Sequence, residues 1–120
     1  MEAAIDYVKD TMIAFSGQQQ VDASVTVPEE HVGAYCHHYP ICVRRILSDE
    51  TLISMASPEA DNSNEDWYSI SVISIDWPSR REGFFLLADF LASRLASQFD
   101  ARCHWGKYNP LDRTSNERLY

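Results

Sequence analysis

The chain has 120 residues, of which 45% are hydrophobic and 23% are charged, a composition typical of one soluble globular domain. Its formal net charge is −8, so the surface is predicted to repel nucleic acid and anionic lipid, and neither is expected as a partner. No apolar run approaches the length of a membrane span, and the acidic N-terminus does not resemble a secretion signal. Three cysteines without a disulfide-framework spacing favour a reducing compartment, so a cytoplasmic location is expected.

The first third of the chain is predicted to hold two helices and a strand. In residues 1–16, apolar side chains recur at three- and four-residue steps, which predicts an amphipathic helix that ends at Gly17. Residues 21–27 alternate between apolar and polar side chains, as in a half-buried strand. Pro28 and the two glutamates after it then favour a short helix that reaches about His38.

The middle of the chain is rich in β-branched and aromatic residues. Pro40 precedes a predicted strand over 41–47, an acidic turn follows, and residues 51–56 form the second strand of a predicted hairpin. Residues 57–66 are polar and are expected to form a loop. Residues 67–75 are the most β-prone segment, and a third strand is expected there.

The last third is predicted to contain the main core helix, over about 80–98. Its apolar stripe consists of Phe84, Leu87, Leu91 and Leu95. A short strand is expected at 101–105, and an irregular tail at 109–120. This order predicts one α+β domain over 1–120, with an antiparallel sheet, helices packed on one face, and a ferredoxin-like form with an extra N-terminal helix.

Residues 103–108, Cys-His-Trp-Gly-Lys-Tyr, are the densest run of reactive and aromatic side chains. A cation, an imidazole, a thiol and two aromatic rings lie within six positions, and Gly106 allows close backbone approach, so the run could serve a small polar ligand. In a purely structural interpretation, Trp105 and Tyr108 pack at the edge of the core and Lys107 is solvated.

Two motifs resemble those of one enzyme family. His-Trp-Gly-Lys followed by Tyr-Asn-Pro is similar to the closing motif of the FAD-dependent aldonolactone and alditol oxidases, such as D-arabinono-1,4-lactone oxidase, which are vanillyl-alcohol-oxidase-type flavoenzymes. The run Pro40-Ile41-Cys42-Val43-Arg44 resembles the strand of the family's substrate-binding, or cap, domain that usually reads Glu-hydrophobic-Arg. Cys42 stands where the glutamate is expected, so the carboxylate that would hold Arg44 is missing from its usual position.

The resemblance implies a set of roles for residues of the two motifs. Arg44 and Lys107 would supply positive charge near the flavin N5 and the reacting oxygen, and His104 would position them or exchange protons. Lys107, Trp105 and Arg44 would contact the flavin. The substrate implied is a small polar alcohol, such as a sugar lactone or a polyol.

The sequence has four glycines and no Gly-rich phosphate loop, so the chain is not expected to hold FAD alone. One hypothesis is a substrate-binding part or subunit that works with a flavin-binding domain on another chain. A second is a flavin-free, non-catalytic interaction domain derived from the cap, which self-associates as a homodimer. A third is a cysteine enzyme that uses Cys103 and His104, although adjacent strand residues point to opposite faces. The cysteines and histidines match no familiar zinc spacing, and no metal is expected.

Overall fold

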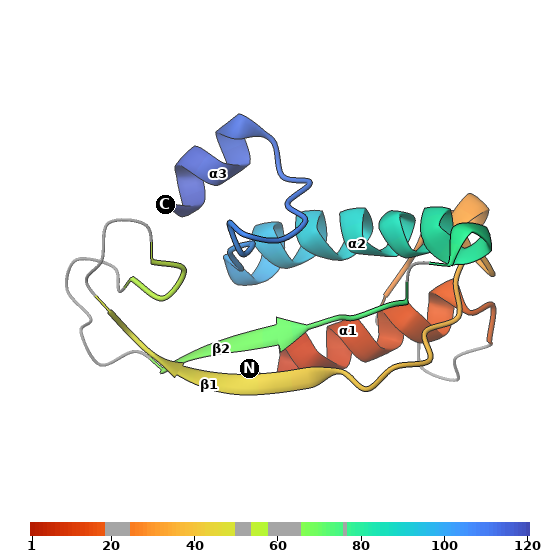
Figure 1. Ribbon diagram of the computed structural model, residues 1–120, viewed down its shortest axis with the longest axis horizontal. Coiled ribbons are helices and arrows are strands. Elements are labelled where there is room, and N and C mark those ends of the chain that lie inside the picture. The colour runs from red at the N-terminus through yellow and green to blue at the C-terminus, as the bar shows by residue number, and fades with distance from the viewer. Residues whose placement is uncertain (19–24, 50–53, 58–65, 76) are drawn as a thin grey trace.

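The computed structural model describes residues 1–18, 25–49, 54–57, 66–75 and 77–120. Three helices and a two-stranded antiparallel sheet confirm the predicted α+β class (Figure 1). The elements in chain order are α1 (Glu2–Phe15), a 3₁₀ turn η1 (Glu29–His31), β1 (Cys42–Leu47), β2 (Asp66–Ser71), α2 (Pro78–Phe99) and α3 (Arg113–Leu119).

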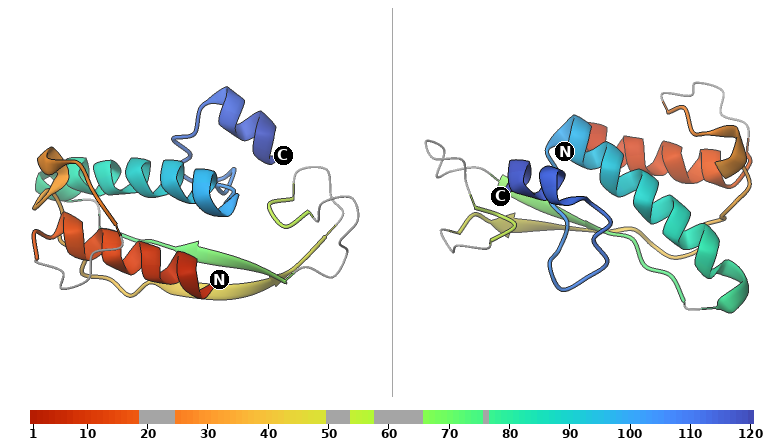
Figure 2. Two further views of the ribbon diagram at one scale, coloured as in Figure 1. Left: turned by 180° about the vertical axis from the view of Figure 1, so that it is seen from behind. Right: turned by 90° about the horizontal axis from the view of Figure 1, so that it is seen from above.

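The core lies between α1 and α2, the two helices whose apolar spacing is clearest in the sequence. Phe15 of α1 and Leu87 of α2 are fully buried, and the rings of Phe15 and Phe90 lie 5.7 Å apart. Val25 and Tyr35, from the segment between α1 and β1, complete the same cluster. Figures 1 and 2 show α1 beside the two-stranded ribbon and α2 above both, so one face of the ribbon is left uncovered by helices.

The ribbon joins two segments that the sequence does not pair. β1 and β2 run antiparallel from Cys42 opposite Ser71 to Leu47 opposite Asp66. The strand predicted at 51–56 is not seen among the described residues, since 51–53 lie outside them and 54–57 form no strand, although the Asp49 amide donates to the Ala56 carbonyl at 3.2 Å. Ser54 Oγ accepts a hydrogen bond from the Ala56 amide at 3.0 Å, and such a local bond competes with strand pairing.

Several predicted bounds also change. The helix expected up to His38 shrinks to η1, because Gly33 adopts a φ of 79°, outside the helical region. Residues 25–27 of the first predicted strand are irregular, and residues 21–24 lie outside the described part of the chain. The strand expected over 67–75 ends at Ser71.

The C-terminal predictions are wrong in both parts. Residues 101–105 form no strand, because Asp100 closes α2 with a left-handed φ of 51° and the chain then turns. Residues 113–119 form α3 rather than an irregular tail. Asp112 caps this helix by accepting the Ser115 amide at 2.7 Å, and Arg113 bonds Glu117 one turn later.

The molecule is open for its size. Its accessible surface is 8367 Å², whereas a compact monomer of 13.7 kDa exposes roughly 6,600 Å². Its radius of gyration is 15.1 Å, against about 13.6 Å for a compact domain of this length. The described residues form two strands, fewer than a ferredoxin-like sheet contains. No helix in the described part is both long and apolar enough to cross a membrane.

Candidate functional site

The predicted His-Trp-Gly-Lys motif forms a tight turn on the surface. The Lys107 amide donates to the His104 carbonyl at 3.0 Å, and the Gly106 amide donates to His104 Nδ1 at 2.9 Å. A Cβ atom at position 106 would lie 3.3 Å from the His104 ring, so glycine suits this approach. The turn thus brings His104, Trp105 and Lys107 together, with all three side chains exposed.

Aromatic residues from other elements hold the turn in place. The rings of Trp105 and Tyr120 lie 4.5 Å apart, and the Tyr120 hydroxyl donates to the Cys103 carbonyl. Tyr108 packs against Phe85 of α2 at 4.7 Å. The exposed fractions of Trp105 and Tyr108 are still 47% and 50%, so neither ring belongs to the core. Trp105 and Tyr108 therefore pack against other aromatic rings, as a structural role predicts, but both are about half exposed and are not part of the core.

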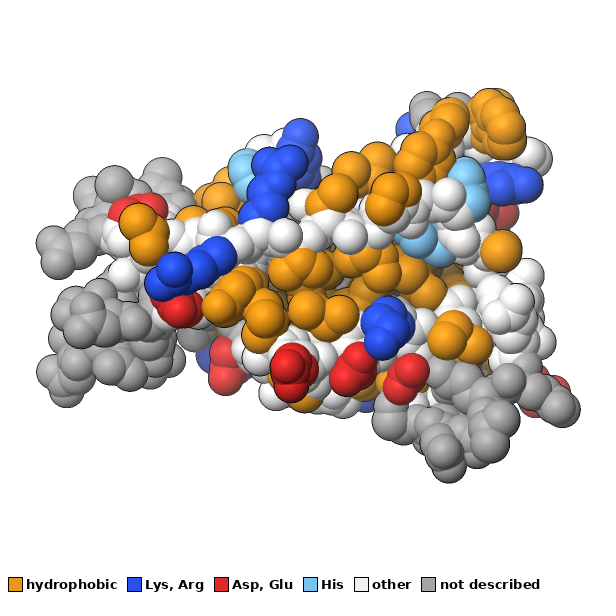
Figure 3. All heavy atoms as spheres, turned by 90° about the horizontal axis from the view of Figure 1, so that it is seen from below, with side chains coloured by type: hydrophobic (Ala, Val, Ile, Leu, Met, Phe, Trp, Pro, Cys, Tyr) orange, Lys and Arg blue, Asp and Glu red, His pale blue; other side chains and the backbone are white. Residues whose placement is uncertain are grey.

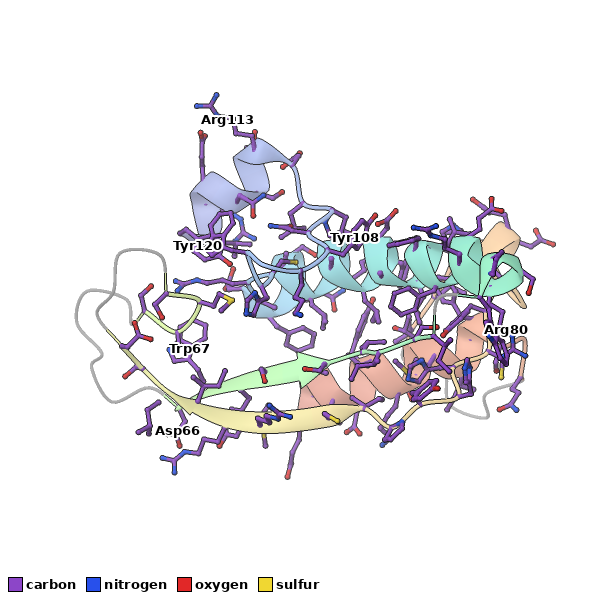
Figure 4. All side chains as sticks on the ribbon, in the orientation of Figure 1. Asp66, Trp67, Arg80, Tyr108, Arg113 and Tyr120 are labelled. Carbon is purple, nitrogen blue, oxygen red and sulfur yellow. The ribbon has the colours of Figure 1, made fainter. Side chains whose placement is uncertain are left out.

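Arg102 joins the C-terminal segment to the ribbon, a role that neither sequence motif indicates. Its Nη1 donates to the carbonyl and the hydroxyl of Ser57 at 3.0 and 2.8 Å. Its guanidinium lies 4.7 Å from the Trp67 ring centroid and 5.3 Å from that of Tyr120. In Figure 4, Trp67 points from β2 toward the C-terminal segment that carries Tyr120, whereas Asp66 points the other way. These partners lie far apart in sequence, so no local pattern could have identified them.

Arg44 lies on β1, as the motif requires, and opposite Ser69 of β2. Its neighbour Arg45 faces the other side of the ribbon, where its Nε donates to Asp66 at 2.9 Å. Arg44 is exposed, and no described residue gives it a hydrogen bond, ion pair or ring contact. The turn makes no such contact with Arg44 either. Within the described residues, Arg44 and Lys107 are therefore both exposed to solvent, and no such contact joins Arg44 to the turn.

Cys103 does not have the environment of a nucleophile. It is half-buried, and burial raises the pKa of its thiol, which leaves less of the reactive thiolate near neutral pH. The neighbouring His104 uses Nδ1 to accept the Gly106 amide. In the neutral ring, Nε2 then carries the proton and can donate a hydrogen bond but cannot act as a base.

Two shallow hollows are lined neither by Arg44 nor by residues 103–108. One, of about 180 Å³, is lined by Ser74, Ile75, Arg81, Phe84 and Phe85. The other, of about 270 Å³, lies between α1 and residues 36–41. Ligand pockets usually measure roughly 300–1,000 Å³. Among the described residues, no three His, Cys, Asp or Glu side chains come together as a metal site would require.

One curated protein is similar to much of this chain. It is a long-chain alcohol oxidase from an uncultured marine euryarchaeote, and 86 residues align with 54% identity. The aligned residues make up 72% of this chain but 17% of the relative, so the chain spans a small part of the relative's length. No protein-family profile matches the chain, and no solved structure matches it. The chain is therefore similar to a segment of a protein named as an oxidase of alcohols.

Proposed function

We propose that this chain is the substrate-binding part of an oxidoreductase that acts on an alcohol and that works with a flavin-binding region. The observation that carries the proposal is the 54% identity over 86 residues to a segment of a long-chain alcohol oxidase. The exposed turn and strand β1 add side chains of the kind expected from the sequence motifs, namely Lys107, His104, Trp105 and Arg44.

The described residues do not fit FAD as its sole binding site. Neither hollow is large enough to enclose a dinucleotide, and neither is lined by Arg44 or by the turn. An exposed lysine, arginine and indole can instead cover one side of a cofactor that a second region holds. We therefore assign the binding of FAD to the partner region, with Lys107, Trp105 and Arg44 contacting its exposed side.

The charges of Lys107 and Arg44 and the hydrogen bonding of His104 suggest what these side chains would do in the reaction. When bound, a flavin would accept a hydride from the carbinol carbon of an alcohol, and the hydroxyl proton would leave to water, which gives the carbonyl product and the reduced flavin. Lys107 and Arg44 would bind the alcohol oxygen and stabilise the negative charge that develops on it. His104 would donate a hydrogen bond from Nε2 and orient the substrate, because its Nδ1 is occupied by the Gly106 amide.

The proposal has two forms, which differ in whether the substrate is a sugar lactone or polyol, or a long-chain alcohol. The sequence motifs favour a sugar lactone or polyol, whereas the relative is named for long-chain alcohols. The side chains beside the cations favour the second class, because Trp105 and Tyr108 are half exposed and Ile46 shares the ribbon face of Arg44. We expect an alkyl alcohol to be oxidised faster than D-arabinono-1,4-lactone.

The test combines this chain with the relative's own remainder. The euryarchaeal oxidase is expressed without the segment that aligns here, loaded with FAD, and mixed with this chain. Reduction of the flavin is then followed by its absorbance after addition of 1-decanol or D-arabinono-1,4-lactone. Lys107→Met is expected to lower kcat by about 100-fold or more with little change in KM, the effect of removing a charge that acts in the transition state.

The chain offers a matched control, because Lys9 is its other lysine. Lys9 lies on α1, where it pairs with Asp6, and Lys9→Met is expected to leave turnover unchanged. If the mixture reduces no flavin with either substrate, the proposal is wrong. If in addition the chain forms a stable homodimer without flavin, the non-catalytic, self-associating domain is the better function, and the exposed apolar side chains of β1 are the observation that would favour it.

A further inference from the structure

Strand β1 is the least covered part of the ribbon. Five of its six residues are exposed, whereas four of the six residues of β2 are at least half-buried. Val43, Ile46 and Leu47 have exposed fractions of 38%, 36% and 73%. Figure 3 shows hydrophobic side chains gathered in the middle of the underside of the molecule. An isolated two-stranded ribbon is only marginally stable in water, and either a packed helix or an added strand stabilises it.

The backbone of β1 has one open edge. In an antiparallel pair, every second residue directs its amide and carbonyl away from the partner strand. β2 occupies one edge of β1, and no described residue forms a backbone hydrogen bond with the other. An open edge of this kind can accept an added strand, because main-chain hydrogen bonds give affinity and side chains give specificity.

Charge discriminates between the possible added strands. The chain has 18 acidic and 10 basic residues, yet β1 carries two arginines and no carboxylate. If two copies paired antiparallel through β1 with Arg44 at the centre, the Arg44 side chains of the two copies would lie directly opposite each other, whereas the charge of Arg45 is already paired with Asp66. Like charges directly opposite are destabilising. A strand that carries a carboxylate beside Arg44 is favoured instead.

We propose that the outer edge of β1 accepts a strand from the flavin-binding region, apolar where it meets Val43 and Ile46 and acidic where it meets Arg44. This inference rests on the proposed function, which supplies the partner. The relative has room for such a strand, since 83% of its length (100 − 17) lies outside the alignment with this chain. The incoming carboxylate would hold Arg44, a role that Cys42 cannot fill as a neutral thiol.

Hydrogen exchange tests the strand directly. Amide exchange of this chain is measured by mass spectrometry, alone and with the FAD-loaded remainder of the euryarchaeal oxidase. Residues 42–47 are expected to exchange at least tenfold more slowly in the complex, while α3 is unchanged. Protection elsewhere with no change at 42–47 would show that the two parts bind through another surface, even if the mixture oxidises alcohol.

Charge reversal tests the assigned carboxylate. Arg44→Glu is expected to weaken binding to the remainder at least tenfold in sedimentation velocity. Arg113→Glu on α3 is the matched control, because it reverses one charge at a position that points away from the ribbon in Figure 4, and it is expected to bind as wild type. If the two variants bind with equal affinity, the proposal that a carboxylate of the added strand pairs with Arg44 is wrong.

The measurements separate this inference from the proposed function. Flavin reduction without slowed exchange at 42–47 sinks the docking surface and keeps the function. Slowed exchange without flavin reduction keeps the surface and sinks the function. A concentration-dependent homodimer with slow exchange at 42–47 in the chain alone would show that a second copy takes the edge, and would overturn the assignment to the flavin-binding region.

Discussion

The pKa of His37 depends on how the side chain is packed. It lies in the wall of the hollow beside α1, near Tyr35 and His38. Burial lowers the pKa of its imidazole, the neighbouring His38 lowers it further, and the backbone at Tyr39 offsets part of the change. The folded chain therefore holds the neutral ring more firmly than the unfolded chain does.

Stability is expected to fall as the pH drops through the ordinary histidine value of 6.5. The folded pKa lies below the unfolded one, so the unfolded state binds more protons in this window, and protonation favours unfolding until the pH is below the folded pKa. Urea unfolding at pH 7.5, 6.5 and 5.5 would measure the loss. His37→Gln is expected to flatten the profile, and an equally steep profile in that variant would assign the loss to other groups.

At the scale of elements, Gly83 near the start of α2 packs directly against the backbone of Ala34 and Tyr35, which precede β1. A Cβ atom on Gly83 would lie 2.2 Å from the Ala34 carbonyl oxygen and 3.2 Å from the Tyr35 Cβ atom. The backbone of that segment therefore crosses α2 at a position where only hydrogen fits. Glycine is costly inside a helix, and this contact is the reason for it here.

Gly83→Ala separates helix propensity from packing. Propensity alone predicts a gain of about 1 kcal/mol, whereas the clash with a backbone carbonyl predicts a loss of roughly 1–3 kcal/mol from overpacking. We expect the loss to dominate, since backbone atoms cannot rotate away. Circular dichroism in urea gives the free energy of unfolding. Glu82→Ala, on the exposed neighbouring position, is the control and should show no such loss.

Local patterns predicted the elements that depend on nearby residues. The spacing of apolar side chains identified α1 and α2, and the β-branched run identified β1. The partner of β1 could not be found in this way, because segments 51–56 and 66–71 are both suitable strands and only the tertiary arrangement selects one. α3 was missed because only Leu119 of its seven residues is buried, although Asp112 is a recognisable cap.

The candidate site was predictable to a similar extent. Period-two geometry requires Arg44 and Arg45 to face opposite sides of β1, and the structure confirms it. The motif around Lys107 was visible in the sequence, but its conformation was not, since a strand was expected where a turn forms. Arg102 and Tyr120 hold that segment through contacts across long sequence separations, which no local pattern indicates.

At the scale of the whole molecule, excess surface is the main feature. The chain exposes roughly 1,800 Å² more than a compact monomer of its mass. Much of what is exposed is apolar, including Leu47 and Ile73. Surface of this kind is unfavourable in water, and a chain that carries it gains stability when a partner covers it.

If the proposed flavin-binding region covers this surface, it is expected to raise the melting temperature of this chain. At a partner concentration 100 times the Kd, binding adds about 2.7 kcal/mol to the folded state, which corresponds to a rise of roughly 10 °C. Differential scanning fluorimetry with increasing amounts of the euryarchaeal remainder would measure it. Serum albumin at the same concentrations is the control, and an unchanged melting temperature at saturation would contradict the expectation.

The positive charge on β1 has a further consequence for the chain on its own. A bare strand edge is a template on which misfolded chains can add, and flat apolar edges seed aggregation. Charged side chains within such a strand act as gatekeepers, because stacking like copies would bring their charges together. Arg44, the charge that would favour an acidic strand, would thus also help to keep the chain in solution, whereas the charge of Arg45 is already paired with Asp66.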